Sequence, residues 1–310
     1  MPARPTHTGA LISALFVTLL WSSSWVLIRW GLDDEALEPL TFASLRYVLA
    51  AIALLAWVLG RPGPRRAVGK LSRRGYVEVA LLGVVFYAVT QGAQFVAIDS
   101  QPAATTSVFL SWTPLLVALL GARSIAERST ARQVIGSVLV GTGAVAYFAG
   151  DLGATPVGVV ASLVGLGANV VAALLGRHVN RDAAAPAVVV TALSMGVGAV
   201  CLLAVGLALE GPPTVSARGW LIIVWLALVN TALAFTLWNL SLRRLTALES
   251  AAINNTMLLQ VAVLAWVFLG ETPGLPEVIG IALVSLGVLM AQTASPRRRR
   301  ELALVEQSAS

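Results

Sequence analysis

Arg46 and a set of uncharged polar and aromatic side chains are the residues of this chain that could do chemistry, because they lie inside apolar segments. A charge within such a segment is costly and usually has a function. Arg46 could hold the carboxylate of a bound molecule or tie helices together, and the sequence leaves both open. No Asp or Glu falls near the middle of an apolar segment, which argues against a site that binds a cation and a proton alternately.

The uncharged polar residues recur at helical spacing and therefore share helix faces. Tyr87, Gln91 and Gln94 do so in one segment, and Asn230 and Trp238 in another. For each residue alone, a hydrogen bond between helices worth about 1 kcal/mol is the alternative, and the tryptophans of the first segment could equally face lipid. As a set they predict a polar, partly aromatic cavity, whose other candidates are Trp21, Ser24, Trp25, Ser111, Asn169, Asn254 and Gln260.

The sequence lacks reactive constellations. It holds no HExxH motif, no pair of intramembrane aspartates and no serine-histidine arrangement. Its single cysteine, Cys201, has no partner for a disulfide or for a cysteine-based metal site. We therefore expect no enzymatic activity, no catalytic residue, no metal and no cofactor.

The elements that position these residues are apolar helices. The chain is 57% hydrophobic and 12% charged, so it cannot bury its apolar surface in one aqueous core. Continuous apolar runs of about 18 residues or more favour membrane-spanning helices over a β-barrel. We expect an all-α membrane protein with ten spans, the first a retained span, at about 9–30, 39–59, 75–97, 101–121, 131–149, 155–177, 186–208, 219–241, 247–268 and 274–293.

Charges in the loops predict the orientation of these spans. When alternate loops are assigned to alternate sides, Arg and Lys gather on one side, which the positive-inside rule makes cytoplasmic. Acidic residues such as Asp33 and Glu210 fall in the opposite loops. We therefore expect both termini in the cytoplasm and a basic cytoplasmic tail over 297–310, and we attribute the basic charge to orientation and not to nucleic acid.

The chain contains an internal repeat. Residues 103–143 align without a gap with 247–287, and the alignment pairs Glu127 with Glu271. The repeating unit holds five helices, an odd number, so its second copy is inverted in the membrane. We expect two five-helix repeats, 1–150 and 151–296, an architecture that recurs in transporters; a duplication retained only for folding is the alternative.

The glycines and Pro114 have structural roles in this interpretation. Gly136 and Gly143, like Gly280 and Gly287, are seven residues apart, where small residues let helices approach closely. Pro114 lacks an N–H for the carbonyl of residue 110 and predicts a bend. We hypothesise that Pro114 is a hinge that helps a gate to move.

Several motifs are spread over nearly the whole chain, namely Trp21 to Trp25, Leu45-Arg46-Tyr47, Thr113-Pro114-Leu115, Thr231 to Phe235, Leu237-Trp238-Asn239, Leu242 to Leu245 and Leu269-Gly270-Glu271. Taken together they resemble the EamA-type branch of the drug/metabolite transporter superfamily. The resemblance implies a ten-helix inverted-repeat fold around a central cavity that commonly serves export of amino acids or related metabolites. Family members often have Glu-Pro in the ninth helix where this chain has Met257-Leu258, which puts a kink there in doubt.

These expectations combine into a carrier that exports small polar metabolites, amino acids or their derivatives foremost, by alternating access. Its expected partners are a small-molecule substrate and membrane lipids, without nucleic acid; the oligomeric state stays open and a monomer is compatible. We expect a bacterial inner membrane location. The alternatives are a scaffold or lipid scramblase, and a nucleotide-sugar-like carrier of the same superfamily, for which one arginine is thin support.

Overall fold

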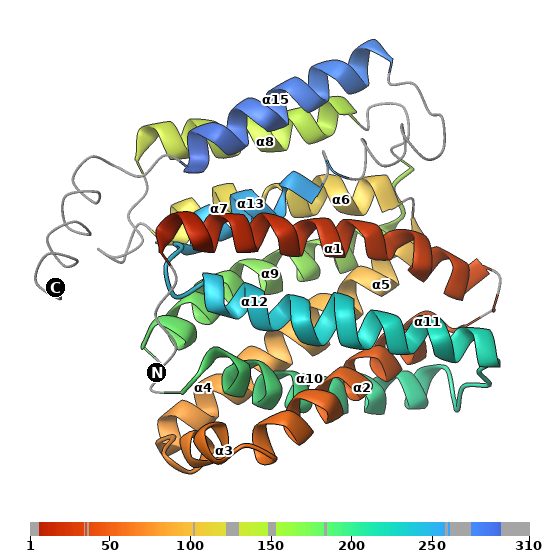
Figure 1. Cartoon of the computed structure of the whole chain (residues 1–310). Coiled ribbons are helices and arrows are strands. Elements are labelled where there is room, and N and C mark those ends of the chain that lie inside the picture. Colours follow the sequence, from red (N-terminus) through yellow and green to blue (C-terminus); the bar gives the residue numbers. More distant parts are fainter. Residues whose placement is uncertain are drawn as a thin grey trace, which may run out of the picture.

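The computed structural model describes residues 6–33, 35, 37–101, 103–121, 130–147, 153–182, 185–257, 260 and 274–292. Within these ranges every regular element is a helix, and the helices pack side by side in one bundle (Figure 1). Parts of the predicted spans, the basic tail and the loops of Glu127 and Glu271 lie outside the described residues.

The helices follow the predicted apolar segments closely. The part before residue 150 contains α1 (His7–Asp33), α2 (Pro39–Leu59), α3 (Pro62–Gly69), α4 (Arg73–Gly83), η1 (Val84–Thr90), α5 (Gln91–Ser100), α6 (Ala103–Ser111), α7 (Thr113–Gly121) and α8 (Ala131–Tyr147). The later part contains α9 (Pro156–Asp182), α10 (Ala187–Leu209), α11 (Ala217–Ala227), η3 (Leu228–Leu233), α12 (Ala234–Ser241), α13 (Ala247–Asn254) and α15 (Leu275–Gln292).

In the described part of the chain, five helical runs are long and apolar enough to cross a membrane, namely 39–59, 73–97, 156–180, 187–209 and 217–241. Two shorter apolar helices cover 108–120 and 278–290. Large apolar side chains on the outside, such as Leu209 and Leu221, are more than two-thirds exposed, as expected for surfaces that contact lipid. The all-helical prediction is confirmed for the described residues, and the count of ten spans stays a prediction.

Helix boundaries repeat at a constant interval along the chain. α4, η1, α6 and α8 begin 144 residues before α11, η3, α13 and α15, respectively. The elements η1 and η3 are π-helical, a rare form that appears as short bulges within α-helices. Ser72 and Ser216, also 144 residues apart, cap α4 and α11 by accepting the amide hydrogens of Gly75 and Gly219. The sequence did not predict the π-helices.

The equivalent helices α8 and α15 pack against each other on one side of the bundle (Figure 1). A Cβ added at Gly143 would lie 2.9 Å from the Gly280 carbonyl oxygen, and one at Gly287 would collide with the Gly136 carbonyl. Gly136 faces Gly287 and Gly143 faces Gly280, so the residue numbers run in opposite directions and the two helices are antiparallel. The predicted packing role of these glycines is confirmed.

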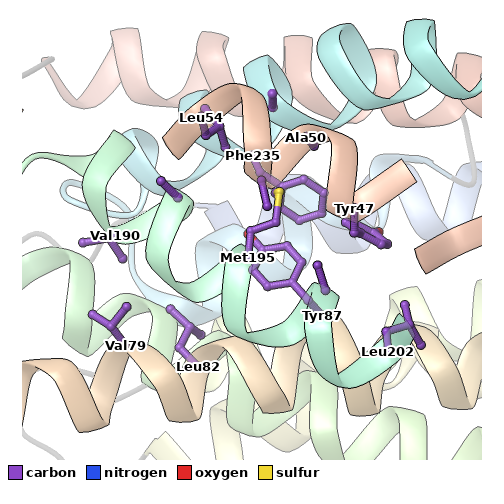
Figure 2. Packing of buried hydrophobic residues seen from close by; sticks show 14 of the residues in the cluster. Tyr47, Ala50, Leu54, Val79, Leu82, Tyr87, Val190, Met195, Leu202 and Phe235 are labelled. Atoms are coloured by element: carbon purple, nitrogen blue, oxygen red, sulfur yellow. The ribbon is translucent and has the colours of Figure 1, made fainter. Parts of the chain in front are cut away.

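The largest core cluster joins α2, α4, η1, α10 and α12 (Figure 2). Tyr87 and Met195 are fully buried there, beside Tyr47 and Phe235. α10 and η1 cross closely here: a Cβ added at Gly198 would lie only 2.5 Å from the Tyr87 Cβ. The absence of a side chain at Gly198 therefore leaves room for Tyr87 at this crossing.

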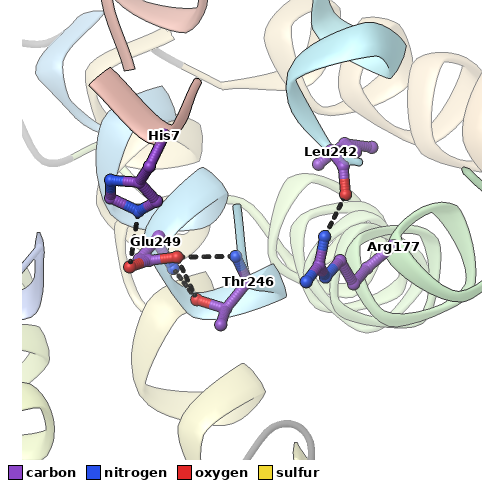
Figure 3. Close-up of polar contacts among 5 residues, drawn as sticks. All are labelled: His7, Arg177, Leu242, Thr246 and Glu249. Carbon is purple, nitrogen blue, oxygen red and sulfur yellow. Dashed lines mark hydrogen bonds and ion pairs between the residues drawn. The ribbon is translucent and has the colours of Figure 1, made fainter. Parts of the chain in front are cut away.

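Polar contacts tie the helix ends. The Glu210 carboxylate accepts the Leu40 and Thr41 amide hydrogens at 2.9 and 2.7 Å and so caps α2 from the end of α10. At the opposite end of the bundle, Glu249 forms a capping box with Thr246 and lies 3.4 Å from His7 Nε2 (Figure 3).

The helix ends correct one predicted boundary. The sixth predicted segment ends at residue 177, whereas α9 continues to Asp182, so Arg177 lies within the helix. The Arg177 side chain is buried and donates to the Leu242 carbonyl (Figure 3). α3 was not predicted, because its run of proline and arginine interrupts the apolar pattern.

Candidate functional site

The fourth apolar segment breaks beside Pro114. α6 ends at Ser111 and α7 begins at Thr113. Pro114 cannot donate to the Leu110 carbonyl, and the Thr113 hydroxyl donates to that carbonyl instead, at 2.6 Å. The structure therefore has an interruption where the sequence predicts one, while its movement as a hinge stays a prediction.

The equivalent helix also breaks, without a proline. α13 ends at Asn254 and a turn follows at Asn255. The Asn255 amide donates to the Ser111 carbonyl at 2.8 Å. The doubt that Met257-Leu258 raised about a kink is thus resolved, since an asparagine turn interrupts the helix here.

Arg46 is buried on α2 and reaches across to η3. Its Nε donates to the Thr231 hydroxyl at 2.6 Å, and one terminal nitrogen lies 3.4 Å from the Asn230 carbonyl oxygen. Its guanidinium carbon is 5.4 Å from the centre of the Tyr47 ring. The described residues offer it neutral partners only.

Asn230 connects η3 with α1. Its amide nitrogen donates to the Leu20 carbonyl at 2.6 Å, and its backbone carbonyl accepts the Trp21 indole N–H at 3.1 Å. The side-chain oxygen of Asn230 is buried and has no hydrogen-bond partner among the described residues. Trp21, Asn230 and Arg46, which the sequence selected separately, therefore form one network.

An aromatic cluster adjoins this network. The Trp21 ring lies 4.8 Å from Phe235 and 5.2 Å from Trp238, between ring centres. Tyr87 lies 5.1 Å from Phe235 and 5.6 Å from Tyr47 (Figure 2). The aromatic side chains that the sequence selected, Trp21, Tyr87 and Trp238, thus lie in one cluster beside the buried arginine, and their role as the lining of a cavity stays a prediction.

Other candidates bond between helices. Gln260 accepts from Ser22 at 2.9 Å and donates to Thr18 at 2.9 Å. Asn169 donates to the Thr113 hydroxyl at 3.2 Å, beside the helix break. These contacts match the interhelical alternative that the sequence analysis kept open.

The remaining candidates are less connected. Ser24 and Ser111 donate to backbone carbonyls three residues earlier, at 2.6 and 2.7 Å. Gln91, Gln94 and Asn254 are half-buried and make no side-chain hydrogen bond within the described part of the chain. The Trp25 side chain lies outside the described residues.

Sequence reasoning missed a second buried polar group. Asn180 donates to the Asn239 side-chain oxygen at 2.7 Å, and Asn239 donates to the Thr191 hydroxyl at 2.9 Å. Asn239 lies one position after Trp238 and was quoted only as part of a motif. Glu249 was also missed, although Thr246 and Glu249 have the spacing of a capping box.

The chemistry available here is binding. Among the described residues, no three His, Cys, Asp or Glu side chains gather as a metal site would require. Donors, acceptors and aromatic rings from α1, α2, η1, η3 and α12 converge instead. This set can recognise a small molecule by charge, hydrogen bonds and apolar contact.

The fold and these contacts define a multi-pass helical membrane protein with a repeated architecture. The chain belongs to the EamA-like transporter family, whose sequence profile matches residues 8–149 and 158–293. This is a family of transporters and not of enzymes.

Two relatives match almost end to end. The chain is 29% identical over 296 residues to a probable terminal-alkyne amino-acid exporter of Streptantibioticus cattleyicolor, which covers 93% of this chain and 95% of that protein. It is 27% identical over 308 residues to the uncharacterized transporter YoaV of Bacillus subtilis, with 93% and 98% covered. A solved crystal structure shares the fold, with a TM-score of 0.74 at 20% identity over 93% of this chain and 98% of that one.

Proposed function

We propose that this protein exports small polar metabolites, amino acids or their derivatives foremost, by alternating access between two inverted five-helix halves. The halves are 1–150 and 151–296. The ten spans, the cytoplasmic termini and the location in a bacterial inner membrane are part of the same proposal.

The repeat carries the proposal. α4, η1, α6 and α8 each begin 144 residues before their equivalents α11, η3, α13 and α15. The equivalent helices α8 and α15 pack antiparallel, with glycines of each helix against the backbone of the other. A two-fold axis that relates two antiparallel membrane-spanning helices lies in the membrane plane. Two halves related in this way give inward-open and outward-open states of similar energy.

The substrate class is supported by a relative and by the candidate site. The similar protein of Streptantibioticus cattleyicolor is named an amino-acid exporter. In this chain Arg46 and its neighbours combine one cation, amide groups and aromatic rings, which suits an amphipathic molecule with one anionic group better than a nucleotide sugar with its two phosphates. Export as the direction rests on that relative and on the family resemblance.

Metabolite comparison followed by reconstitution tests the proposal. Cells with and without the protein are compared for intracellular and extracellular metabolites, and compounds that change are offered to vesicles that contain the purified protein. We expect saturable flux of at least one compound above the flux in protein-free vesicles. Absence of flux for every changed compound, together with transbilayer movement of a fluorescent phospholipid, would favour the scramblase alternative.

A further inference from the structure

Arg46 carries a charge that the described structure does not compensate. Its side chain is 7% exposed, and its polar partners are the Thr231 hydroxyl and the Asn230 carbonyl. Arg46 lies seven residues after the start of α2, about 10 Å along the helix at 1.5 Å per residue. A cation at this depth is costly unless an anion accompanies it.

The neighbouring Asn230 lacks a hydrogen-bond donor for its side-chain oxygen among the described residues. Its amide nitrogen points to two oxygens, of Leu20 and Ser23, which fixes the orientation of the amide group. The side-chain oxygen is then a buried acceptor to which no described residue donates. Unpaired buried acceptors are uncommon and are often explained by a ligand or a function.

The two groups belong to residues in direct contact, because the Arg46 guanidinium reaches the backbone carbonyl of Asn230. A guanidinium pairs best with a carboxylate, which can accept two parallel hydrogen bonds. A free amide oxygen suits an ammonium donor. Trp21, Phe235 and Trp238 provide an apolar, aromatic surface next to both groups.

We propose that Arg46 and Asn230 form the recognition subsite for a zwitterionic amino acid with an apolar side chain. Arg46 binds the carboxylate, the Asn230 side-chain oxygen accepts the ammonium group, and the side chain lies against Trp21 and its aromatic neighbours. The inference rests on the proposed transport function, since access to these buried groups requires the opening of the bundle.

Flux of three matched compounds into vesicles tests the subsite. The compounds are L-phenylalanine, L-phenylalaninamide, which lacks the carboxylate, and 3-phenylpropionate, which lacks the ammonium group. The variants are Arg46→Gln, Arg46→Lys and Asn230→Leu. Arg61→Gln is the control, because it removes an exposed arginine that stacks on Trp57.

The wild type should prefer phenylalanine over each analogue by about thirtyfold or more, the effect of losing one buried charge-assisted contact. Arg46→Gln should abolish the preference for phenylalanine over phenylalaninamide. Asn230→Leu should abolish the preference for phenylalanine over 3-phenylpropionate. Arg46→Lys should still prefer phenylalanine over phenylalaninamide, but by a smaller factor, because lysine cannot bind the carboxylate in a bidentate manner. Arg61→Gln should keep both preferences.

Several results would overturn the subsite. If the folded Arg46→Gln protein still prefers phenylalanine over phenylalaninamide, the role of Arg46 is limited to hydrogen bonds between α2 and η3. Where a variant does not fold, the wild-type ratios decide, and equal flux of all three compounds contradicts the inference. A wild type that moves other metabolites but none of these three refutes the subsite and leaves the transport proposal intact, whereas no flux of any compound refutes the transport proposal.

Discussion

The Asn255 side chain donates a 2.8 Å hydrogen bond to the Ser111 carbonyl, and the two residues stand 144 positions apart. This interval is the same as that between the equivalent helices α6 and α13. Two equivalent residues touch only where the axis that relates the halves passes between them. The breaks in the fourth and ninth segments therefore meet near that axis.

Asn255→Leu should lower the stability of the protein by about 1–2 kcal/mol, because it leaves the buried Ser111 carbonyl without this donor. Thermal unfolding of the purified protein measures the effect. Asn254→Leu is the matched control, since Asn254 is half-buried and its side chain bonds to no described residue. Equal unfolding temperatures for the two variants would show that the contact contributes nothing to stability.

Gly287→Ala should destabilise the pair of α8 and α15 by about 1–3 kcal/mol, since the new methyl group would meet the backbone of Gly136. Gly167→Ala provides the control within a helix, because a Cβ there meets nothing within 4 Å. The control should gain up to about 1 kcal/mol from its higher helix propensity. A Gly287→Ala protein as stable as the control would contradict the close packing, as measured by thermal unfolding.

Glu210→Gln should weaken the cap on α2 by about 1 kcal/mol, because glutamine has one acceptor oxygen whereas the carboxylate accepts the Leu40 and Thr41 amide hydrogens with two. Glu38→Gln is the comparison, because Glu38 precedes the same helix and its side chain makes no capping bond. Hydrogen exchange at the first turn of α2 reports on this end directly. We expect faster exchange in Glu210→Gln than in Glu38→Gln, and the reverse order would contradict the capping role.

Pro114→Ala should slow transport several-fold while the protein stays folded. Alanine restores the N–H for the Leu110 carbonyl, which competes with the Thr113 hydroxyl and straightens the helix. Initial rates in vesicles measure the change, and Pro276→Ala, at an exposed position in the first turn of α15, is the control. Unchanged rates in Pro114→Ala would remove the hinge hypothesis.

Much of the fold could be predicted from the sequence, because apolar length and proline position determine where membrane helices lie. The described bounds of α2 agree with the predicted segment 39–59. Gly136 and Gly143 indicated packing correctly because small residues have few other uses inside an apolar helix. The π-helices could not be predicted, since a change in hydrogen-bond register leaves no mark on hydropathy.

The candidate site was predictable residue by residue but not as a network. Arg46 was conspicuous as a charge in an apolar segment, whereas its partner Thr231 looks like any small polar residue. Asn180 and Asn239 become a pair only when α9 and α12 pack. The sequence also could not reveal that Gln260 bonds to α1, because contacts between distant segments depend on tertiary packing.

Accessibility of two equivalent surface positions tests the inverted repeat most directly. Lys70 and Thr214 are exposed, lie just before α4 and α11, and are 144 residues apart. Each would be changed to cysteine in a Cys201→Ser background and labelled with an impermeant maleimide in right-side-out and inside-out vesicles. We predict that K70C is labelled only in inside-out vesicles and T214C only in right-side-out vesicles; labelling of both from the same side would contradict the account.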